Sequence, residues 1–319
     1  MTQHHKPFRF GLLSHNTSPS QDYLVAQALR AEQAGYATFL LPDHLEDQFA
    51  PALALAMVAQ ATTSIRMGSC VFDNDFRHPA LLAKDVATLD QLSHGRFEFG
   101  LGAGWMQSEY ECIGLTFDRP IVRIDRLAEA IQIVKALLTE ETVTFSGQYY
   151  SITGMRGLPK PLQKPYPPIY LGGSGKRMLQ LAAREASCVG IVPRIKKAER
   201  GEHMNDLLDI DDATPEALQQ KISWIREAAG PRFAELELNI VLLDVQVTDE
   251  REQTQRTLAE RYGASAQALQ DSPFFLIGNY EQICEKLWQI RERFGCSYIV
   301  TWEEHLESLA PVVAHLTGR

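Results

Sequence analysis

The 319-residue sequence predicts a (β/α)8 barrel, in which eight parallel strands close into a cylinder covered by helices. Strand-like and helix-like segments alternate along almost the whole chain, which is typical of parallel strands packed under helices. Eight strand-like segments within about 300 residues favour a closed barrel over an open sheet. No linker rich in Pro, Ser or Gly divides the chain, so we expect one domain over residues 1–319.

The first half of the chain supplies four of these strand and helix units. Short apolar segments bounded by turn residues predict strands at 8–13, 37–41, 65–72 and 96–102. Longer segments of helical periodicity or apolar character predict helices at 20–35, 50–63, 78–95 and 123–139. Ser20 is a candidate N-cap of the first helix, and Gly35 and Gly95 are stop signals. The mostly apolar segment 50–63 is expected to be a buried helix.

The second half repeats the pattern after a hairpin insertion expected at about 140–160. Strands are expected at 169–171, 188–192, 236–247 and 297–301. Helices are expected at 176–186, 214–230, 249–263, 280–296 and 303–316. Thr214 as N-cap, Pro215 at the first helical position and Gly230 as stop define one of them. The charged, irregular segment at about 195–213 predicts a mobile loop.

The composition and charge of the chain exclude several classes of protein function. The chain is 45% apolar and 22% charged, carries a net charge of −9 and has no basic run, so we expect no nucleic-acid partner. The five cysteines show no C-x-x-C or zinc spacing, which fits a reducing, cytoplasmic setting. The N-terminus does not read as a signal peptide, and the longest apolar stretch, 50–59, is too short for a bilayer, so no membrane is expected.

In a barrel of this kind the active site lies at the C-terminal ends of the strands. These ends are rich in polar, aromatic and glycine residues, although loops are commonly polar in any protein. The residues there are Ser14 to Asn16, Asp43 and His44, Cys70 to Asn74, Gly102 to Trp105, Gly172 to Lys176, Pro193 and Arg194, and Thr301 to Glu303.

The loop after the fifth strand has the composition of an anion site. It contains three glycines, a serine and two cations at the start of a helix, where backbone amides have no acceptor. Met178 stands where a dinucleotide fingerprint needs glycine, and Arg177 where a P-loop needs Ser or Thr. The alternative is a tight turn that simply requires glycine. The residues are Gly172, Gly173, Ser174, Gly175, Lys176 and Arg177.

Asp43 and His44 follow the second strand. An imidazole at a strand end can act as a general acid or base, because its pKa lies near neutrality. The alternative is that Asp43 caps the next segment and His44 makes only a polar contact. His15 or His78 would be needed beside them for a metal site, but the chain has no H-x-x-x-H or H-E-x-x-H motif, so we expect no metal.

Four stretches, in order, resemble the bacterial luciferase-like oxidoreductase superfamily, and most closely its coenzyme F420-dependent branch. They are AEQAGYATFLLPDH (31–44), RHPALLAKDVATLDQLSHGRFEFGLGAGW (77–105), RIDRLAEAIQIVKALLTEETVTFSGQYYSI (123–152) and PKPLQKPYPPIYLGGSGKRMLQLAA (159–183). The resemblance implies a barrel that binds F420, or alternatively FMN, at the strand C-termini.

The resemblance also implies residue roles. The cofactor ring is expected against a bulge at Cys70 and Val71, joined by a non-proline cis peptide bond. The cofactor phosphate is expected in the loop of Gly172, Gly173, Ser174 and Gly175, with Lys176 beside it. Asp43 and His44 match an Asp-His pair of F420-dependent dehydrogenases, which implies catalytic roles for both and a cofactor contact for Asp43.

One position departs from the F420-dependent sugar-phosphate dehydrogenases. Their glutamate after the fourth strand is matched by Trp105, and Glu109 follows four residues later. An aromatic side chain there predicts a flat or apolar substrate rather than a sugar phosphate. His15, Arg194 and Trp302 complete the expected substrate pocket, although each also fits an ordinary role in a solvated loop or at a helix start.

The expected function is F420-dependent hydride transfer to or from a small organic substrate, with His44 moving the proton. One alternative is a two-component monooxygenase that uses reduced FMN from a separate flavin reductase. A further alternative is a binding protein that sequesters a flavin or deazaflavin without catalysis. Because members of this superfamily are often dimers, we expect a homodimer, with the helices at 50–63 and 78–95 as interface or core.

Overall fold

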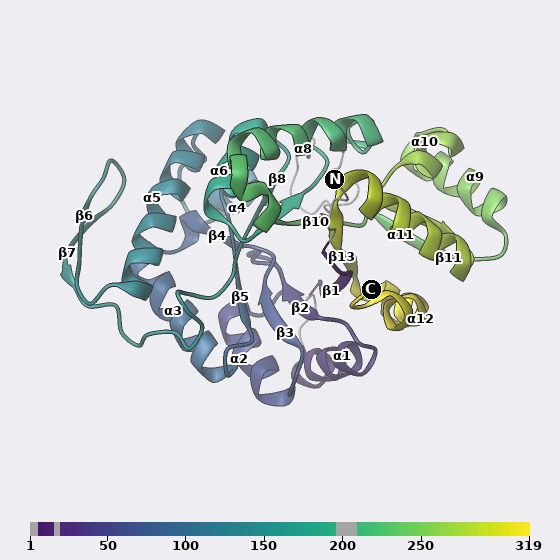
Figure 1. Cartoon of the computed structure of the whole chain (residues 1–319). Coiled ribbons are helices and arrows are strands. Elements are labelled where there is room, and N and C mark those ends of the chain that lie inside the picture. Colours follow the sequence, from purple (N-terminus) through teal and green to yellow (C-terminus); the bar gives the residue numbers. More distant parts are fainter. Residues whose placement is uncertain (1–5, 16–19, 196–208) are drawn as a thin grey trace.

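The computed structural model describes residues 6–15, 20–195 and 209–319, and its eight parallel strands form a closed barrel with helices outside (Figure 1). The predicted fold class is therefore confirmed. In order around the barrel the strands are β1 (Arg9–Leu13), β2 (Thr38–Leu41), β3 (Arg66–Ser69), β5 (Phe97–Gly102), β8 (Ile169–Gly173), β9 (Cys188–Ile191), β10 (Glu237–Val241) and β13 (Cys296–Trp302), and β13 pairs with β1.

Side chains alternate along each strand between the helix layer and the barrel interior. The main core lies between strands and helices, where Phe10, Phe39 and Phe99 are fully buried. A second, smaller cluster fills the inside of the barrel and includes Leu40 and Val300. The first cluster holds the barrel closed, and the second lies beneath the strand ends where the site is expected.

The helices match the predicted segments closely. They are α1 (Gln21–Gln33), α2 (Pro51–Ala61), α3 (Pro79–Leu92), α5 (Pro120–Thr139), α6 (Lys176–Glu185), α8 (Pro215–Ala229), α9 (Arg251–Tyr262), α11 (Tyr280–Phe294) and α12 (Leu306–Leu316), with the short helices α4 (Gln107–Cys112) and α10 (Ala266–Asp271). The Thr214 hydroxyl accepts the Ala217 amide, as an N-cap does. Ser20 is the N-cap residue of α1, as predicted, but its side chain makes no capping hydrogen bond.

The predicted strand at 236–247 is in fact two strands. The Leu242 amide still donates to Val300 of the barrel, whereas the next amide, Leu243, donates to Phe274. The chain thus leaves the barrel as β11 (Asp244–Val247) and pairs with β12 (Phe275–Gly278), which the sequence analysis missed. Together with α9 and α10 they form an insertion before the last barrel strand (Figure 1). Both sides of the break are apolar, so periodicity alone did not reveal it.

The predicted third strand, 65–72, is interrupted. β3 ends at Ser69, the Cys70–Val71 peptide bond is cis, and β4 (Phe72–Asp73) resumes against β5. The non-proline cis bond implied by the resemblance is therefore confirmed at the expected residues.

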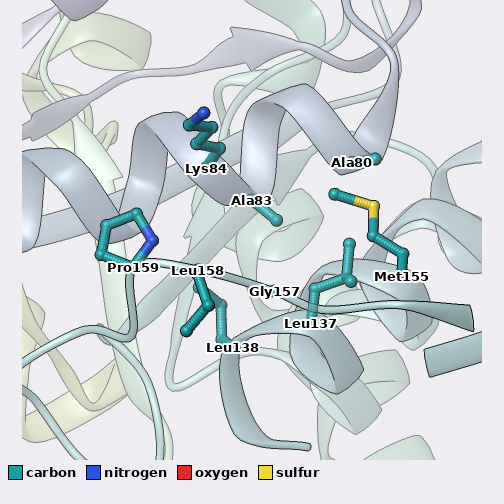
Figure 2. Close-up of a pocket in the computed structure, with 9 residues that line it drawn as sticks. All are labelled: Ala80, Ala83, Lys84, Leu137, Leu138, Met155, Gly157, Leu158 and Pro159. Carbon is teal, nitrogen blue, oxygen red and sulfur yellow. The ribbon is translucent and has the colours of Figure 1, made fainter. Parts of the chain in front are cut away.

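The predicted hairpin is present as β6 (Val143–Ser146) and β7 (Ser151–Met155). Beyond it, the chain passes between α3 and α5, where Gly157 lies so close to the Leu137 carbonyl that a Cβ atom would collide with it. Figure 2 shows the side chains around a cavity of about 10 Å³ at this crossing, which is far too small for a flavin. In the described parts of the chain, no helix has the length and apolar character to cross a membrane.

Candidate active site

The His44 imidazole, just after β2, pairs with the buried Glu109 carboxylate of α4. Its Nδ1 atom lies 3.2 Å from both Oε1 and Oε2 of Glu109, and the Leu45 amide donates to Oε1 at 2.7 Å. Burial alone would lower the pKa of His44, but the hydrogen bond and charge of Glu109 outweigh it and raise this pKa. Nε2 has no partner among the described residues, so it is the nitrogen available to a bound molecule.

Trp105 borders this pair. Its indole contacts the His44 ring edge to face, with ring centroids 5.6 Å apart and an interplanar angle of 88°. The preceding residue, Gly104, has φ +73°, and a Cβ atom there would collide with the Tyr110 hydroxyl. The Arg123 guanidinium donates to the Ala103 carbonyl at 3.0 Å and holds this loop. The loop thus fixes an aromatic wall beside the imidazole.

Asp43 is tied to the segment that follows β4. Its carboxylate, 3% exposed, accepts two hydrogen bonds from the Arg77 guanidinium and one from the Asp73 amide at 2.9 Å. Both oxygens are therefore engaged within the protein. Asp43 connects the end of β2 to the chain beyond the cis bond, which places it to orient its neighbour His44; a direct catalytic role stays a prediction.

A second contact anchors α4 to the same segment. The Tyr110 hydroxyl lies 3.1 and 3.2 Å from the two Asp73 oxygens and 3.2 Å from Asp75, which Arg126 binds at 2.8 Å. Burial raises the pKa of Asp73 to about 7, and the charge of Asp75 adds to this effect. Consecutive residues of α4 thus bind the ends of two strands, Glu109 at β2 and Tyr110 at β4.

The inside of the barrel beneath these groups is mostly apolar. Tyr170 crosses the interior, where its hydroxyl donates to Asn239 Oδ1 at 2.9 Å. Burial raises the pKa of the Cys70 thiol to about 11, so this thiol is neutral at physiological pH. The side chains of the interior cluster are Leu13, Leu40, Tyr170, Cys188, Val241, Tyr298, Val300 and Trp302, with Cys70, Val71 and Val192 against it. Such a lining suits a flat, largely apolar ring.

His15 and Trp302 meet where β1 and β13 end. Their rings stack with centroids 4.5 Å apart and an interplanar angle of 11°. His15 Nε2 lies 3.1 Å from Glu304 Oε2; burial alone would lower the pKa of His15, but Glu304 and then Glu303 raise it. The structure therefore brings two of the expected pocket residues together.

Arg194 occupies a different setting. Its side chain, 63% exposed, lies 3.1 Å from Asp209 and 3.6 Å from Asp212. Its backbone amide also donates to Asp212, while its carbonyl accepts the Asp209 amide. These bonds close the base of the loop expected at about 195–213, of which residues 196–208 lie outside the described residues. The described contacts join Arg194 to this loop base and to none of the other pocket candidates.

The glycine loop joins β8 to α6. The first amides of a helix have no intrahelical acceptor, and the N-cap residue, Gly175, supplies no side-chain cap. Space around Gly175 is open, with no heavy atom within 4 Å of a Cβ atom placed there. Arg177 pairs with Asp125 of α5, so Lys176 is the cation left without an acidic partner among the described residues. These features fit a phosphate group.

In the described ranges, no three His, Cys, Asp or Glu side chains converge as ligands for a metal ion. Residues 5–272 match the family of luciferase-like monooxygenases. The chain belongs to this luciferase-like family.

Relatives of this luciferase-like chain include two F420-dependent dehydrogenases. The F420-dependent glucose-6-phosphate dehydrogenase of Kineococcus radiotolerans is 31% identical over 57% of this chain and 55% of its own length. The F420-dependent hydroxymycolic acid dehydrogenase of Mycobacterium tuberculosis is 36% identical over 51% of this chain and 47% of its own length. The chain therefore spans about half the length of the curated relatives it matches.

One solved structure superimposes on almost the whole chain. The coenzyme F420-dependent tetrahydromethanopterin reductase of Methanopyrus kandleri superimposes with a TM-score of 0.77 over 98% of this chain and 100% of its own. Its sequence is 16% identical, so this likeness concerns the fold alone.

Glu109 is the main site residue whose role the sequence analysis missed. It lies in a short helix, 65 residues from its partner in the chain. Its position soon after the end of β5 was the available signal, since strand ends converge in a barrel. Nothing in that signal identified His44 as the partner.

Proposed function

We propose that this protein is an F420-dependent oxidoreductase that transfers hydride to or from a small organic substrate. The observation that carries the proposal is the His44–Glu109 pair at the end of β2, where the adjacent Asp43 binds the chain just beyond the Cys70–Val71 cis bond. The relatives named as F420-dependent dehydrogenases support the choice of cofactor.

The residues present fit this cofactor. The loop of Gly172, Gly173, Ser174 and Gly175, with Lys176, would hold its phosphate, because helix amides and a cation favour an anion. Cys70 and Val71 would contact its ring, and Asp43 would hold the adjoining segment in place. When bound, F420 supplies a carbon centre that gives or accepts a hydride.

The side chains then handle the proton and the substrate. Glu109 holds His44 at Nδ1 and favours the imidazolium, so the Nε2 proton is available to an oxygen formed at the substrate. In the reverse direction, neutral His44 accepts that proton. Trp105 and the apolar interior exclude water and bind a flat substrate, and the stacked His15 and Trp302 close the opposite wall. Arg194 at the loop base is the fourth residue of this proposed pocket.

The second candidate is a monooxygenase that uses reduced FMN delivered by a separate reductase. The description of the matched family as luciferase-like monooxygenases favours it. The same glycine loop and apolar interior would serve FMN. A protein that only sequesters the cofactor ranks third, because such a protein does not need the proton transfer that the His44–Glu109 pair would perform.

We also propose a cytoplasmic homodimer. Leu53 of α2 is 76% exposed and Leu81 of the neighbouring helix α3 is 64% exposed, so the two packed helices carry apolar side chains into solvent. Helix α2 is therefore only partly buried, contrary to the prediction for 50–63. Five unpaired cysteines support a reducing compartment.

The cofactor is tested by titrating the purified protein anaerobically with F420 and, separately, with FMN, following fluorescence. Tight F420 binding, with turnover of an alcohol, enone or imine, supports hydride transfer. Binding of FMN alone, with oxygen uptake when a flavin reductase is added, supports the monooxygenase. Tight binding without turnover of any acceptor would leave the sequestering protein.

A further inference from the structure

A groove is lined by residues of α8, α10 and α11. Figure 1 shows these helices on the outside of the barrel. The groove has a volume of about 950 Å³, and none of its lining residues belongs to the site at the strand ends. One part of its wall is apolar, formed by Pro273, Ile290 and Phe294. Another part carries three cations, Arg251, Lys286 and Arg293.

These cations are poorly neutralised. The Arg251 side chain forms no hydrogen bond or ion pair within the described ranges, and its Nε atom is buried without a partner. Lys286 Nζ donates to the Gln270 carbonyl at 2.5 Å, and no described carboxylate lies within ion-pair distance of it. The nearest carboxylate to Arg293 is that of Glu216, at 3.8 Å.

Two of the four acidic residues of the lining accept hydrogen bonds from glutamine amides of their own helices. Both Asp271 oxygens accept from the Gln267 amide at 2.9 Å, and Glu285 accepts from Gln289 at 3.3 Å. The remaining two, Glu216 and Glu292, are exposed at the groove edge. The contacts with glutamine amides do not remove the negative charges of Asp271 and Glu285. They hold the carboxylate oxygens of each residue against a neighbour on the same helix.

The surroundings of Lys286 change the pKa of its ammonium group. Burial lowers the pKa of Lys286 to about 8; Asp271 opposes the shift, and the charges of Arg251 and Arg293 add to it. The charges of Arg251 and Arg293 disfavour the Lys286 ammonium, and an anion placed between the three cations would offset this repulsion. A group with two negative charges at one end would relieve it most.

We propose that this groove binds an organic phosphate, with the phosphate held by Arg251, Lys286 and Arg293 and the organic part against Pro273, Ile290 and Phe294. Guanidinium groups bind phosphate through paired, charge-assisted hydrogen bonds, and lysine adds a point charge. The groove lies within the size range of small-molecule sites, roughly 300–1,000 Å³. The bound phosphate stabilises the Lys286 ammonium, so binding near pH 8 takes up protons.

Isothermal titration with phenyl phosphate at pH 8, in two buffers of different ionisation enthalpy, tests the proposal. We expect saturable binding with a buffer-dependent heat that reports proton uptake. Arg251→Gln and Lys286→Gln should each weaken binding about tenfold or more, and Lys286→Gln should also remove the proton uptake. Lys286→Arg should keep much of the affinity without the uptake.

Two control variants show whether the phosphate binds in this groove. Arg256→Gln removes an exposed arginine from the same helix as Arg251 and should change nothing. Gly175→Asp alters the glycine loop at the strand ends and should leave binding in this groove intact. The proposal is overturned by no binding at millimolar phenyl phosphate, by equal binding of inorganic sulfate, or by unchanged affinity in the Arg251 and Lys286 variants, with melting curves showing that both are folded.

Discussion

The His44 imidazole and the Glu109 carboxylate, 65 residues apart in the chain, meet with Nδ1 3.2 Å from both carboxylate oxygens. The same carboxylate accepts the Leu45 amide, so it fixes both the ring and the backbone that carries it. Helix α4 therefore acts as a clamp on the end of β2, and its Glu109 raises the pKa of the imidazole.

Glu109→Gln should lower the pKa of His44. The amide oxygen still accepts from Leu45, but the charge that favours the imidazolium is gone, so we expect a fall of about one pH unit. If His44 donates the proton, activity falls as pH rises through this pKa, and the variant should lose activity at lower pH. The imidazole titration followed by NMR measures the shift without a substrate. Glu111→Gln, on the same helix but exposed, is the control, and an equal His44 pKa in both variants would contradict the prediction.

Gly175→Asp should weaken binding of the cofactor phosphate while the fold is kept. Gly175 is the N-cap of α6, has φ −90° and has open space for a side chain, so aspartate there caps the helix favourably. Its charge repels the phosphate, and we expect affinity for F420 or FMN to fall about tenfold or more. Gly175→Asn is the matched neutral cap. Equal affinity of the two variants would place the phosphate elsewhere.

Arg77→Gln should destabilise the protein strongly. It leaves the Asp43 carboxylate, 3% exposed, without its counter-charge, and removing one partner of such a pair costs about 3–5 kcal/mol. Adding Asp43→Asn should restore much of the lost stability. It removes the unpaired charge, and the side-chain oxygen of asparagine can still accept the hydrogen bond from the Asp73 backbone amide. Urea denaturation measures both. Arg256→Gln should cost less than about 0.5 kcal/mol, and a similar small cost for Arg77→Gln would show that the Arg77–Asp43 pair does not stabilise the fold.

Leu53→Asp and Leu81→Asp should dissociate the proposed homodimer. A charge placed in an apolar interface is left desolvated and unpaired. Light scattering after gel filtration should give about twice the chain mass of 35.8 kDa for the native protein and the single-chain mass for the variants. Val247→Asp, at an exposed apolar residue of β11, should remain dimeric. A native protein that elutes as a monomer would remove the dimer from the proposal.

Some of the candidate site followed from local sequence alone. A glycine loop before a helix and a histidine after a strand are short-range patterns, and the barrel places strand ends together whatever the loops contain. The pairing of Glu109 with His44 did not follow, since α4 is a short helix without periodicity. Likewise, the sequence analysis included Arg177 among the cations of the anion site, but Asp125 of α5 pairs with it.

By itself, the sequence determined the strand and helix order, the barrel class and the position of the glycine loop, because alternating apolar periodicity and turn residues act over a few neighbouring residues. Only the tertiary structure decided that β10 ends at Val241 and β11 leaves the barrel, since this depends on whether Leu243 bonds to β13 or to Phe274. Only the tertiary structure gave His44 its partner and Asp43 its ion pair. Charges and hydrogen bonds act over a few ångströms in space, and the chain brings such groups together from distant positions when it closes the barrel.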